Sequence, residues 1–404
     1  MLCVLLVVGC IWLTSSQPIA HADYLTEWFG SVPVLGITVN DYPSPVAALS
    51  CVTGGAEVFC VGGLDNRSQT TAMAYTAPLS TLGVGGWARL TSYPTGIAGQ
   101  SCVTYSGYVY CVGGLQSAET SSSKSEITPA VYFAPLTASG VGGWIRTTDY
   151  PFGVYDQSCA VLQGYVYCVG GVSSNSTTMS AVEYARLSPS GVAGWTTASS
   201  YPIDVAAESC SSYSTQLYCV GGLNATSVAV ETVYHASLNG TELGWSAETN
   251  YPTPVAGQSC VIHYPGLYCI GGLDATSYAT TSVFFSYLNE TRLDWTGSSA
   301  YPVDIQGQSC VTYSGQIYCI GGYNGLQILE SVYFSSVGST QTAVMATTTT
   351  TAGYVNYTAV ARYNLAMDLV LAATACASIL IIVFSPPRRI SAMREDSPRG
   401  SSAE

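Results

Sequence analysis

The chain has 404 residues, a formal net charge of −13 at pH 7, and charged side chains at only 9% of its positions. This acidic, charge-poor composition excludes a nucleic-acid-binding surface, which needs clustered Lys and Arg. Solubility must come from neutral polar groups and attached sugar, and such a surface keeps its character in acid. Adaptation to an acidic milieu is therefore one hypothesis, and heavy glycosylation at neutral pH is the alternative.

The first 22 residues have the pattern of a secretory signal. Residues 2–13 are almost wholly apolar, and Ala20, His21 and Ala22 form a small-x-small cleavage pattern. A retained membrane helix is the alternative, but the apolar stretch is short for one. We expect residues 1–22 to be a signal peptide and the remainder to be exported.

Two cysteines nine positions apart occur six times, and the second is always followed by Gly-Gly. The pairs are Cys51 with Cys60, Cys102 with Cys111, Cys159 with Cys168, Cys210 with Cys219, Cys260 with Cys269, and Cys310 with Cys319. Folding each segment about a tight turn places the cysteines opposite each other, where Cα atoms approach to about 4.5 Å and a disulfide is allowed. Zinc fits this spacing poorly, because no histidine accompanies the pairs. We expect six hairpin disulfides, no metal site, and Cys376 as the one free cysteine of the exported chain.

The cysteine pairs recur at steps of 50 to 57 residues, which indicates a repeat architecture. In the second unit, alternating apolar residues predict strands A to D over 99–105, 108–114, 129–137 and 144–150. A tryptophan follows the third strand of five units, and Tyr-Pro lies six residues after it. These tryptophans are Trp87, Trp144, Trp195, Trp245 and Trp295.

Gly-Gly after strand B, an aromatic residue in strand C, and then Trp and X-Pro make this unit resemble the Kelch repeat. The resemblance covers about residues 42–337 and implies an all-β, six-bladed β-propeller. The chain lacks the Arg that commonly follows X-Pro in Kelch repeats and adds a cysteine pair, so no Kelch ligand site is carried over. The last unit has no Trp, whereas the N-terminus supplies Trp28 and Tyr42-Pro43. We expect residues near 27–41 to form the outer strand of the last blade and close the ring within 23–337.

The C-terminal region has the pattern of a membrane anchor. Residues 338–364 are Thr-rich and predict a flexible stalk, and Leu365 to Phe384 is long and apolar enough to span a bilayer. Arg388 and Arg389 place the tail, 385–404, in the cytoplasm. A buried core helix is the alternative, and the polar tail argues against a GPI signal. We expect a single-pass protein of the cell membrane with its N-terminal domain outside the cell.

Six N-glycosylation sequons fall in predicted loops or in the stalk, which favours a glycoprotein. They begin at Asn66, Asn175, Asn224, Asn239, Asn289 and Asn356.

Few residues suit catalysis. The exported domain has two histidines, His235 and His263, in different units, whereas a copper oxidase of the galactose-oxidase kind needs clustered His and Tyr. A sialidase would hold its substrate carboxylate with three arginines, and the arginines here share no repeat position. We expect no catalytic residue and no cofactor, and a glycan-active enzyme such as a sialidase-like hydrolase is the least favoured alternative.

One position, two residues before the first cysteine, is polar in five units. It holds Gln100, Gln157, Glu208, Gln258 and Gln308, and Leu49 in the first unit. Such a ring of amides either binds a polar ligand or satisfies backbone groups of neighbouring blades. We favour the second interpretation.

The expected function is binding or adhesion at the cell surface, with an extracellular protein or glycan as partner. A structural envelope component without a discrete ligand is the main alternative, because propellers serve several roles. The D–A and B–C connections should share one face, and on it the fifth and sixth blades lack sequons. We expect contact there, at Asp274, Tyr278, Tyr323 and Asn324, near Gln258 and Gln308.

Overall fold

The computed structural model describes residues 24–25, 27–30, 38–116, 126–137, 140–240, 242–288, 292–338, 349–351 and 354–356. All regular elements in these ranges are strands, and none of the described residues form a helix long and apolar enough to cross a bilayer. The predicted signal peptide, membrane span, tail and Cys376 lie outside the described residues. The chain divides into two units, Met1–Ser339 and Thr340–Glu404. In the second, β36 (Thr349–Thr351) pairs antiparallel with β37 (Tyr354–Asn356).

The first unit consists of six antiparallel sheets of four main strands, which we call blades one to six, with strands A to D in each. The A strands are β3 (Ser50–Gly54), β9 (Ser101–Tyr105), β17 (Ser158–Leu162), β24 (Ser209–Tyr213), β29 (Ser259–His263) and β33 (Ser309–Tyr313). The B strands are β4 (Glu57–Val61), β10 (Tyr108–Val112), β18 (Tyr165–Val169), β25 (Gln216–Val220), β30 (Gly266–Ile270) and β34 (Gln316–Ile320).

The C strands are β5 (Ala74–Ser80), β13 (Val131–Thr137), β20 (Val182–Ser188), β27 (Val233–Asn239), β31 (Val283–Tyr287) and β35 (Val332–Gly338). The D strands are β7 (Ala88–Arg89), β15 (Ile145–Arg146), β22 (Thr196–Thr197), β28 (Glu242–Ala247), β32 (Thr296–Gly297) and, in blade six, β1 (Tyr24–Leu25).

Two sets of short strands complete the sheets. Beside the C–D turns lie β6 (Gly83–Val84), β14 (Gly140–Val141), β21 (Gly191–Val192) and β2 (Thr38–Val39), which pairs parallel with β6. In the D–A and B–C loops lie β8 (Ile97–Ala98), β11 (Leu115–Gln116), β12 (Glu126–Ile127), β16 (Val154–Tyr155), β19 (Val172–Ser173), β23 (Val205–Ala206) and β26 (Leu223–Asn224). Because β8 pairs with β11, the D–A and B–C loops share one face.

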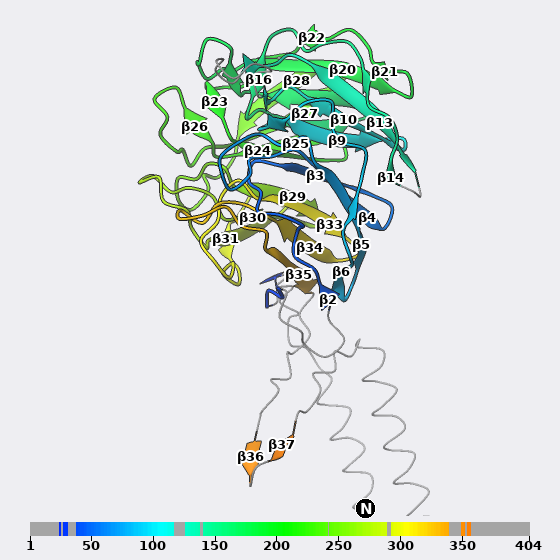
Figure 1. The fold of residues 1–404 in the computed structure, drawn as a ribbon. Coiled ribbons are helices and arrows are strands. Elements are labelled where there is room, and N and C mark those ends of the chain that lie inside the picture. The colour runs from blue at the N-terminus through cyan, green and yellow to red at the C-terminus, as the bar shows by residue number, and fades with distance from the viewer. Residues whose placement is uncertain are drawn as a thin grey trace, which may run out of the picture. The chain divides into compact units, whose positions relative to one another are not determined.

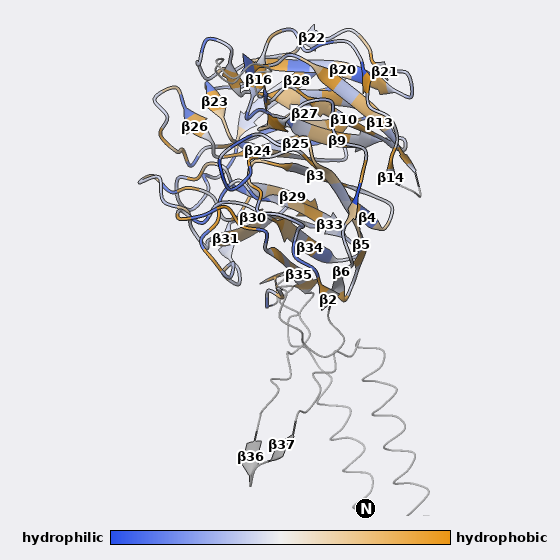
Figure 2. Ribbon diagram, in the orientation of Figure 1, coloured by the Kyte–Doolittle hydropathy of each residue, from blue (hydrophilic) through white to orange (hydrophobic). Residues whose placement is uncertain are grey.

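The six A strands contact one another in a closed cycle, from β3 through β9, β17, β24 and β29 to β33 and back to β3 (Figure 1). Apolar residues are concentrated in the strands (Figure 2), and buried clusters fill the spaces between adjacent blades. The all-β propeller that the sequence predicted is thus the fold of the first unit.

The strands of blade two are shorter than predicted, for identifiable backbone reasons. Gly99, Gly113 and Gly114 have φ values of +63°, +63° and +113°, so strand A begins two residues later than predicted and strand B ends two residues earlier. Strand D covers only Ile145–Arg146 of the predicted 144–150, and beyond it the N–H groups of Thr147 and Tyr150 still donate to the carbonyls of Val131 and Pro129.

All six predicted disulfides are present. They join Cys51 to Cys60, Cys102 to Cys111, Cys159 to Cys168, Cys210 to Cys219, Cys260 to Cys269, and Cys310 to Cys319. In every hairpin the two cysteines are direct partners across strands A and B, and their Cα atoms lie 4.0 Å apart. This separation is shorter than the about 4.5 Å expected for such a pair.

The bridges belong to the core of the propeller rather than to its surface. The second cysteine of every pair is fully buried, with 0% of its surface exposed, and the first is 6–8% exposed. The fully buried members are Cys60, Cys111, Cys168, Cys219, Cys269 and Cys319. Each packs in an apolar cluster between blades, as Cys60 does beside Tyr318 and Ile320 of blade six. The disulfides therefore have a structural role, since no reductant reaches these sulfurs in the folded protein.

The hairpin turns differ between blades. Both turn residues have positive φ at Ser106-Gly107, whereas blade five turns through a cis Tyr264–Pro265 peptide. One register therefore holds in all six hairpins although their turns differ.

We expect non-reducing peptide mapping to find each cysteine joined to its partner nine residues away. Replacing both Cys102 and Cys111 with serine should lower the free energy of unfolding by ~2.5 kcal/mol, because the bridge closes a short loop in the unfolded chain. Denaturant titration of the variant measures this loss. A bridge between two blades would contradict the hairpin register.

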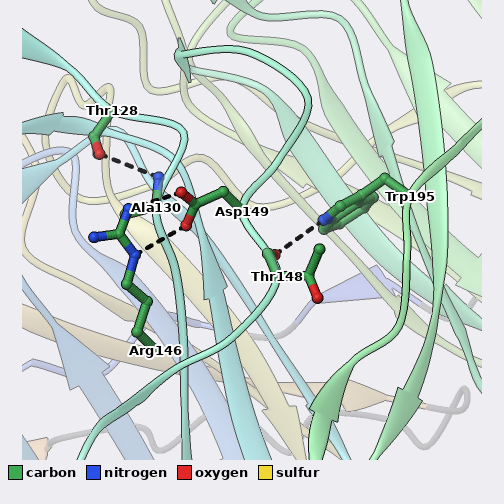
Figure 3. Close-up of polar contacts among 6 residues, drawn as sticks. All are labelled: Thr128, Ala130, Arg146, Thr148, Asp149 and Trp195. Carbon is green, nitrogen blue, oxygen red and sulfur yellow. Dashed lines mark hydrogen bonds and ion pairs between the residues drawn. The ribbon is translucent and has the colours of Figure 1, made fainter.

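Each tryptophan that follows a C strand joins two blades. Trp195 Nε1 donates to the carbonyl of Thr148 at 3.2 Å (Figure 3), and its ring meets the Tyr150 ring edge-on at 4.8 Å between centroids. The same tyrosine–tryptophan contact occurs at all six blade interfaces. The pairs are Tyr42 with Trp87, Tyr93 with Trp144, Tyr150 with Trp195, Tyr201 with Trp245, Tyr251 with Trp295, and Tyr301 with Trp28.

The N-terminal segment supplies the missing parts of blade six. β1 pairs with β35, Phe29 bridges Phe334, and Trp28 Nε1 donates to the carbonyl of Ser299 at 3.1 Å. The predicted outer strand over 27–41 is misplaced, because pairing begins at Tyr24 and residues 38–39 join blade one. The long interval between Trp28 and Tyr42 had concealed this offset.

Replacing Trp28 with alanine should destabilise the protein by roughly 2–3 kcal/mol, because the edge-on ring contact and the hydrogen bond to Ser299 are both lost. Chemical denaturation of the Trp28→Ala and Trp195→Ala variants gives their free energies of unfolding. The pair compares the tryptophan contact made by the N-terminal segment with the equivalent contact between two internal blades. If Trp195→Ala lowers the free energy of unfolding and Trp28→Ala leaves it unchanged, the N-terminal segment does not stabilise the closed ring.

Candidate functional site

Six backbone hydrogen bonds form a closed ring at the start of the A strands. Each member has φ between 51° and 64° and donates its N–H to the carbonyl of the equivalent residue in the preceding blade, at 2.8–2.9 Å. The members are Ala48, Gly99, Asp156, Ala207, Gly257 and Gly307, and Ala48 closes the ring by donating to Gly307.

Two further rings surround the first. The serine before each first cysteine accepts the N–H of that cysteine in the next blade, and Ser309 closes this ring on Cys51 at 2.9 Å. The second glycine of each Gly-Gly donates to a D–A loop carbonyl of the next blade, and Gly322 closes that ring on Val46 at 2.7 Å. The Gly-Gly signature follows from this approach, since a Cβ on Gly321 would lie 2.3 Å from the Val46 oxygen.

The ring of amides braces neighbouring blades. Gln258 Nε2 donates to the Val220 carbonyl at 2.6 Å, and Gln308 Nε2 donates to the Ile270 carbonyl at 2.7 Å. Gln100 and Gln157 make the same contact, and all four side chains are buried. This arrangement matches the structural interpretation of the ring, so Gln258 and Gln308 are left out of the proposed contact surface.

Glu208 takes the place of a glutamine in blade four. Gly113 and Gly170 are equivalent glycines in adjacent blades. Glu208 Oε1 lies 3.0 Å from the position of a Cβ built on Gly170, and Gln157 Nε2 lies 3.0 Å from the position of a Cβ built on Gly113. The Glu208 oxygen therefore takes the place of the Gln157 nitrogen. An oxygen in a donor's place needs a proton to serve the carbonyl that it faces. Burial, aided by the nearby Asp156 carboxylate, raises the pKa of Glu208 to about 8 against the opposing effect of backbone N–H groups of Glu208 and Ser158.

Stability should decrease as pH rises. The pKa of Glu208 is about 8 in the folded protein and near 4.5 when unfolded, so its contribution is complete below pH 4.5 and lost as pH passes 8. Asp156, whose pKa burial raises to about 6, acts in the same direction. Of the other groups coupled to Glu208, Tyr150 and Tyr201 remain neutral, because burial raises the pKa of both phenols.

We therefore expect Glu208→Gln to raise the melting temperature at pH 9 by several degrees and to have little effect at pH 5. Adding Asp156→Asn should reduce the remaining change of melting temperature with pH. Asparagine tolerates the left-handed backbone at this position. Thermal melts of the wild type and both variants across this pH range measure the effect. A wild-type melting temperature that rises from pH 5 to pH 9 would contradict the assignment of a protonated Glu208 in the folded protein.

Asp274 and Asn324 fix the B–C loops of blades five and six. Asp274 Oδ1 accepts hydrogen bonds from Thr276 and from the Tyr278 N–H, which hold the pKa of its carboxyl below the usual value. Asn324 Oδ1 accepts the N–H groups of Leu326 and Gln327. Asp65 and Asn224 cap the corresponding loops of blades one and four. Both candidate residues therefore shape their loops, as Asx turns do.

These caps present apolar side chains at the loop tips of three consecutive blades. Tyr278 is 72% exposed, Leu326 is 90% exposed and Val228 is 47% exposed. The position four residues after the cap is Val228 in blade four and Tyr278 in blade five, but Gln69 in blade one and Thr177 in blade three. Tyr323 lies lower in its loop, where its hydroxyl donates to the Gly325 carbonyl at 2.8 Å. The sequence singled out Tyr278 but missed Leu326 and Val228.

The histidines and arginines are dispersed among the blades. His235 Nδ1 lies 2.8 Å from Glu248 Oε1 in blade four, whereas His263 ends strand A of blade five. Arg146 pairs with Asp149 at 2.7 Å on the outside of blade two (Figure 3). Among the described residues, no group of three or more His, Cys, Asp or Glu side chains is arranged to hold a metal ion.

The sequons differ in accessibility. Asn66, Asn175 and Asn239 are exposed, whereas Asn224 is half-buried and its Oδ1 caps its own loop. Asn289 lies outside the described residues, as does the side chain of Asn356.

Comparison with known proteins supports the architecture. The Kelch motif model matches residues 306–333, which run from the D–A loop of blade six into β35. A solved structure titled "Structure of YjhT" aligns with a TM-score of 0.62 at 15% identity, covering 80% of this chain and 99% of that chain. The fold is a Kelch-type propeller. No curated protein sequence matches the chain. In all, 796 chains of solved structures match it, so the fold alone does not choose a function.

Proposed function

We propose that this Kelch-type propeller is the extracellular binding domain of a surface-anchored glycoprotein and that it recognises a protein partner through the B–C face of blades five and six. The observation that carries the proposal is the pair of exposed apolar tips, Tyr278 and Leu326, on adjacent loops. Exposed apolar side chains on rigid loops suit a protein interface, because they bury apolar area with little loss of conformational freedom.

The capped loops support this assignment. Asp274 Oδ1 and Asn324 Oδ1 each accept several hydrogen bonds within their own loops, so the tips are ordered before a partner arrives. Six disulfides support an oxidising compartment, which agrees with export. The B–C loops of blades five and six contain no sequon, so no N-linked sugar is attached to the loops that carry Tyr278 and Leu326. The proposal assigns binding rather than catalysis to this face.

The Tyr278→Ser and Leu326→Ser double variant should weaken partner binding by tenfold or more without lowering the melting temperature, because both side chains project into solvent. Cross-linking of the full-length protein to intact cells of its source identifies the partner, and titration with that partner gives the affinities. Leu82→Ser, which removes a side chain 56% exposed on the opposite face, is the matched control. Equal binding by the double variant, or cross-links confined to the opposite face, would contradict the proposal.

A further inference from the structure

A hollow of about 520 Å³ opens on the opposite face, between the A–B turns of blades one and two. It exists because blade one departs from the repeat. The last residue of strand A is large in the other blades but is Gly54 in blade one, opposite Glu57. The residues at this position elsewhere are Tyr105, Leu162, Tyr213, His263 and Tyr313.

A second departure occurs in the same hairpin. Phe59 stands where strand B of every other blade has tyrosine. In blade two Tyr110 donates its hydroxyl to the Ser188 carbonyl of the next blade at 2.7 Å, and Tyr318 makes the same clasp to Ser80 at 2.6 Å. Phe59 has no hydroxyl to make this clasp, and it lines the hollow instead. Two losses in one hairpin therefore open a single space.

The walls of this space combine one carboxylate with threonine hydroxyls and apolar side chains. Glu57, Thr53 and Thr104 line it beside Leu136, and none of the described lining residues is cationic. The Phe59 ring is buried at 2% exposure, and the Tyr105 hydroxyl is directed toward Gly164 of blade three. Thr76 Oγ1 lies 2.8 Å from Glu57 Oε2 and holds that carboxylate in place. The volume lies within the range of about 300–1,000 Å³ for small-molecule sites.

We propose that this hollow is a binding site for a neutral sugar unit of a glycan. A carboxylate accepts hydrogen bonds from adjacent sugar hydroxyls, threonine hydroxyls donate or accept as required, and the half-buried Leu136 side chain offers apolar surface to the C–H groups of a pyranose. An anionic sugar is disfavoured, because Glu57 is acidic and the whole chain carries a charge of −13. This site lies on the A–B face and is independent of the contact proposed at Tyr278 and Leu326.

The test uses full-length protein whose own N-linked sugars have been removed enzymatically. Calorimetry and saturation-transfer NMR measure binding of neutral oligosaccharides ending in glucose, galactose, mannose or N-acetylglucosamine, with sialyllactose and an unrelated peptide library for comparison. We expect a neutral sugar to bind. Gly54→Tyr, which introduces the tyrosine that blades two, four and six have at this position and fills the space, should abolish that binding.

Glu57→Gln keeps the shape of the site and should weaken binding about tenfold or more. A Cβ at position 54 would lie 2.8 Å from Leu136 Cδ1, so Gly54→Tyr can fail to fold. In that case the Glu57→Gln variant tests the site. Glu242→Gln removes an exposed carboxylate on the same face and should leave binding unchanged. The proposal is overturned if no neutral sugar binds, if Glu57→Gln binds as well as the wild type, or if only sialyllactose or peptides bind.

Discussion

The ring of backbone hydrogen bonds from Ala48 round to Gly307 is the constraint on which the rest of this propeller depends. Each bond requires a left-handed backbone at its donor, which fixes the direction in which the chain enters every A strand. The serine and cysteine that follow are then placed to bond across the next interface, as Ser309 does to Cys51. The hairpin register and its disulfide follow from that placement, and so does the need for Gly-Gly where the next blade approaches.

Departures from this regular pattern are more informative than the pattern itself. Glu208 replaces an amide by an acid that must hold a proton to serve the same carbonyl, so it makes the blade interface sensitive to pH. Gly54 lacks the side chain and Phe59 lacks the hydroxyl that the other blades have at these positions, and an open space lies beside them. Local choices that conflict with an otherwise consistent design are expected at functional or strained sites. Because this interface is most stable at low pH, it also agrees in sign with the hypothesis of an acidic milieu that the charge-poor composition suggested.

The sequence was sufficient for features set by neighbouring residues and insufficient for those set by packing. Cys102 and Cys111 could be paired because alternation and turn position determine register within a hairpin. The loop-capping role of Asp274 and Asn324 could not be assigned from the sequence, because an exposed ligand group and an Asx cap have the same sequence signature. The hollow at Gly54 could not be predicted, because it depends on Leu136 from the adjacent blade. The serines before the cysteines escaped notice because serine is abundant throughout the chain.

The closure of blade six has a mechanical consequence. β35 lies between β1 and β34, and the chain leaves the propeller directly after Gly338, whose partner is Tyr24. Tension applied from the C-terminal side therefore pulls β35 along its own length, and the ladder bonds on both edges resist together because they lie across the strand. Beyond β35 the force next meets Cys319, which is covalently joined to Cys310. A pull on this end of the propeller is therefore resisted by shear across two ladders rather than by the opening of one bond at a time.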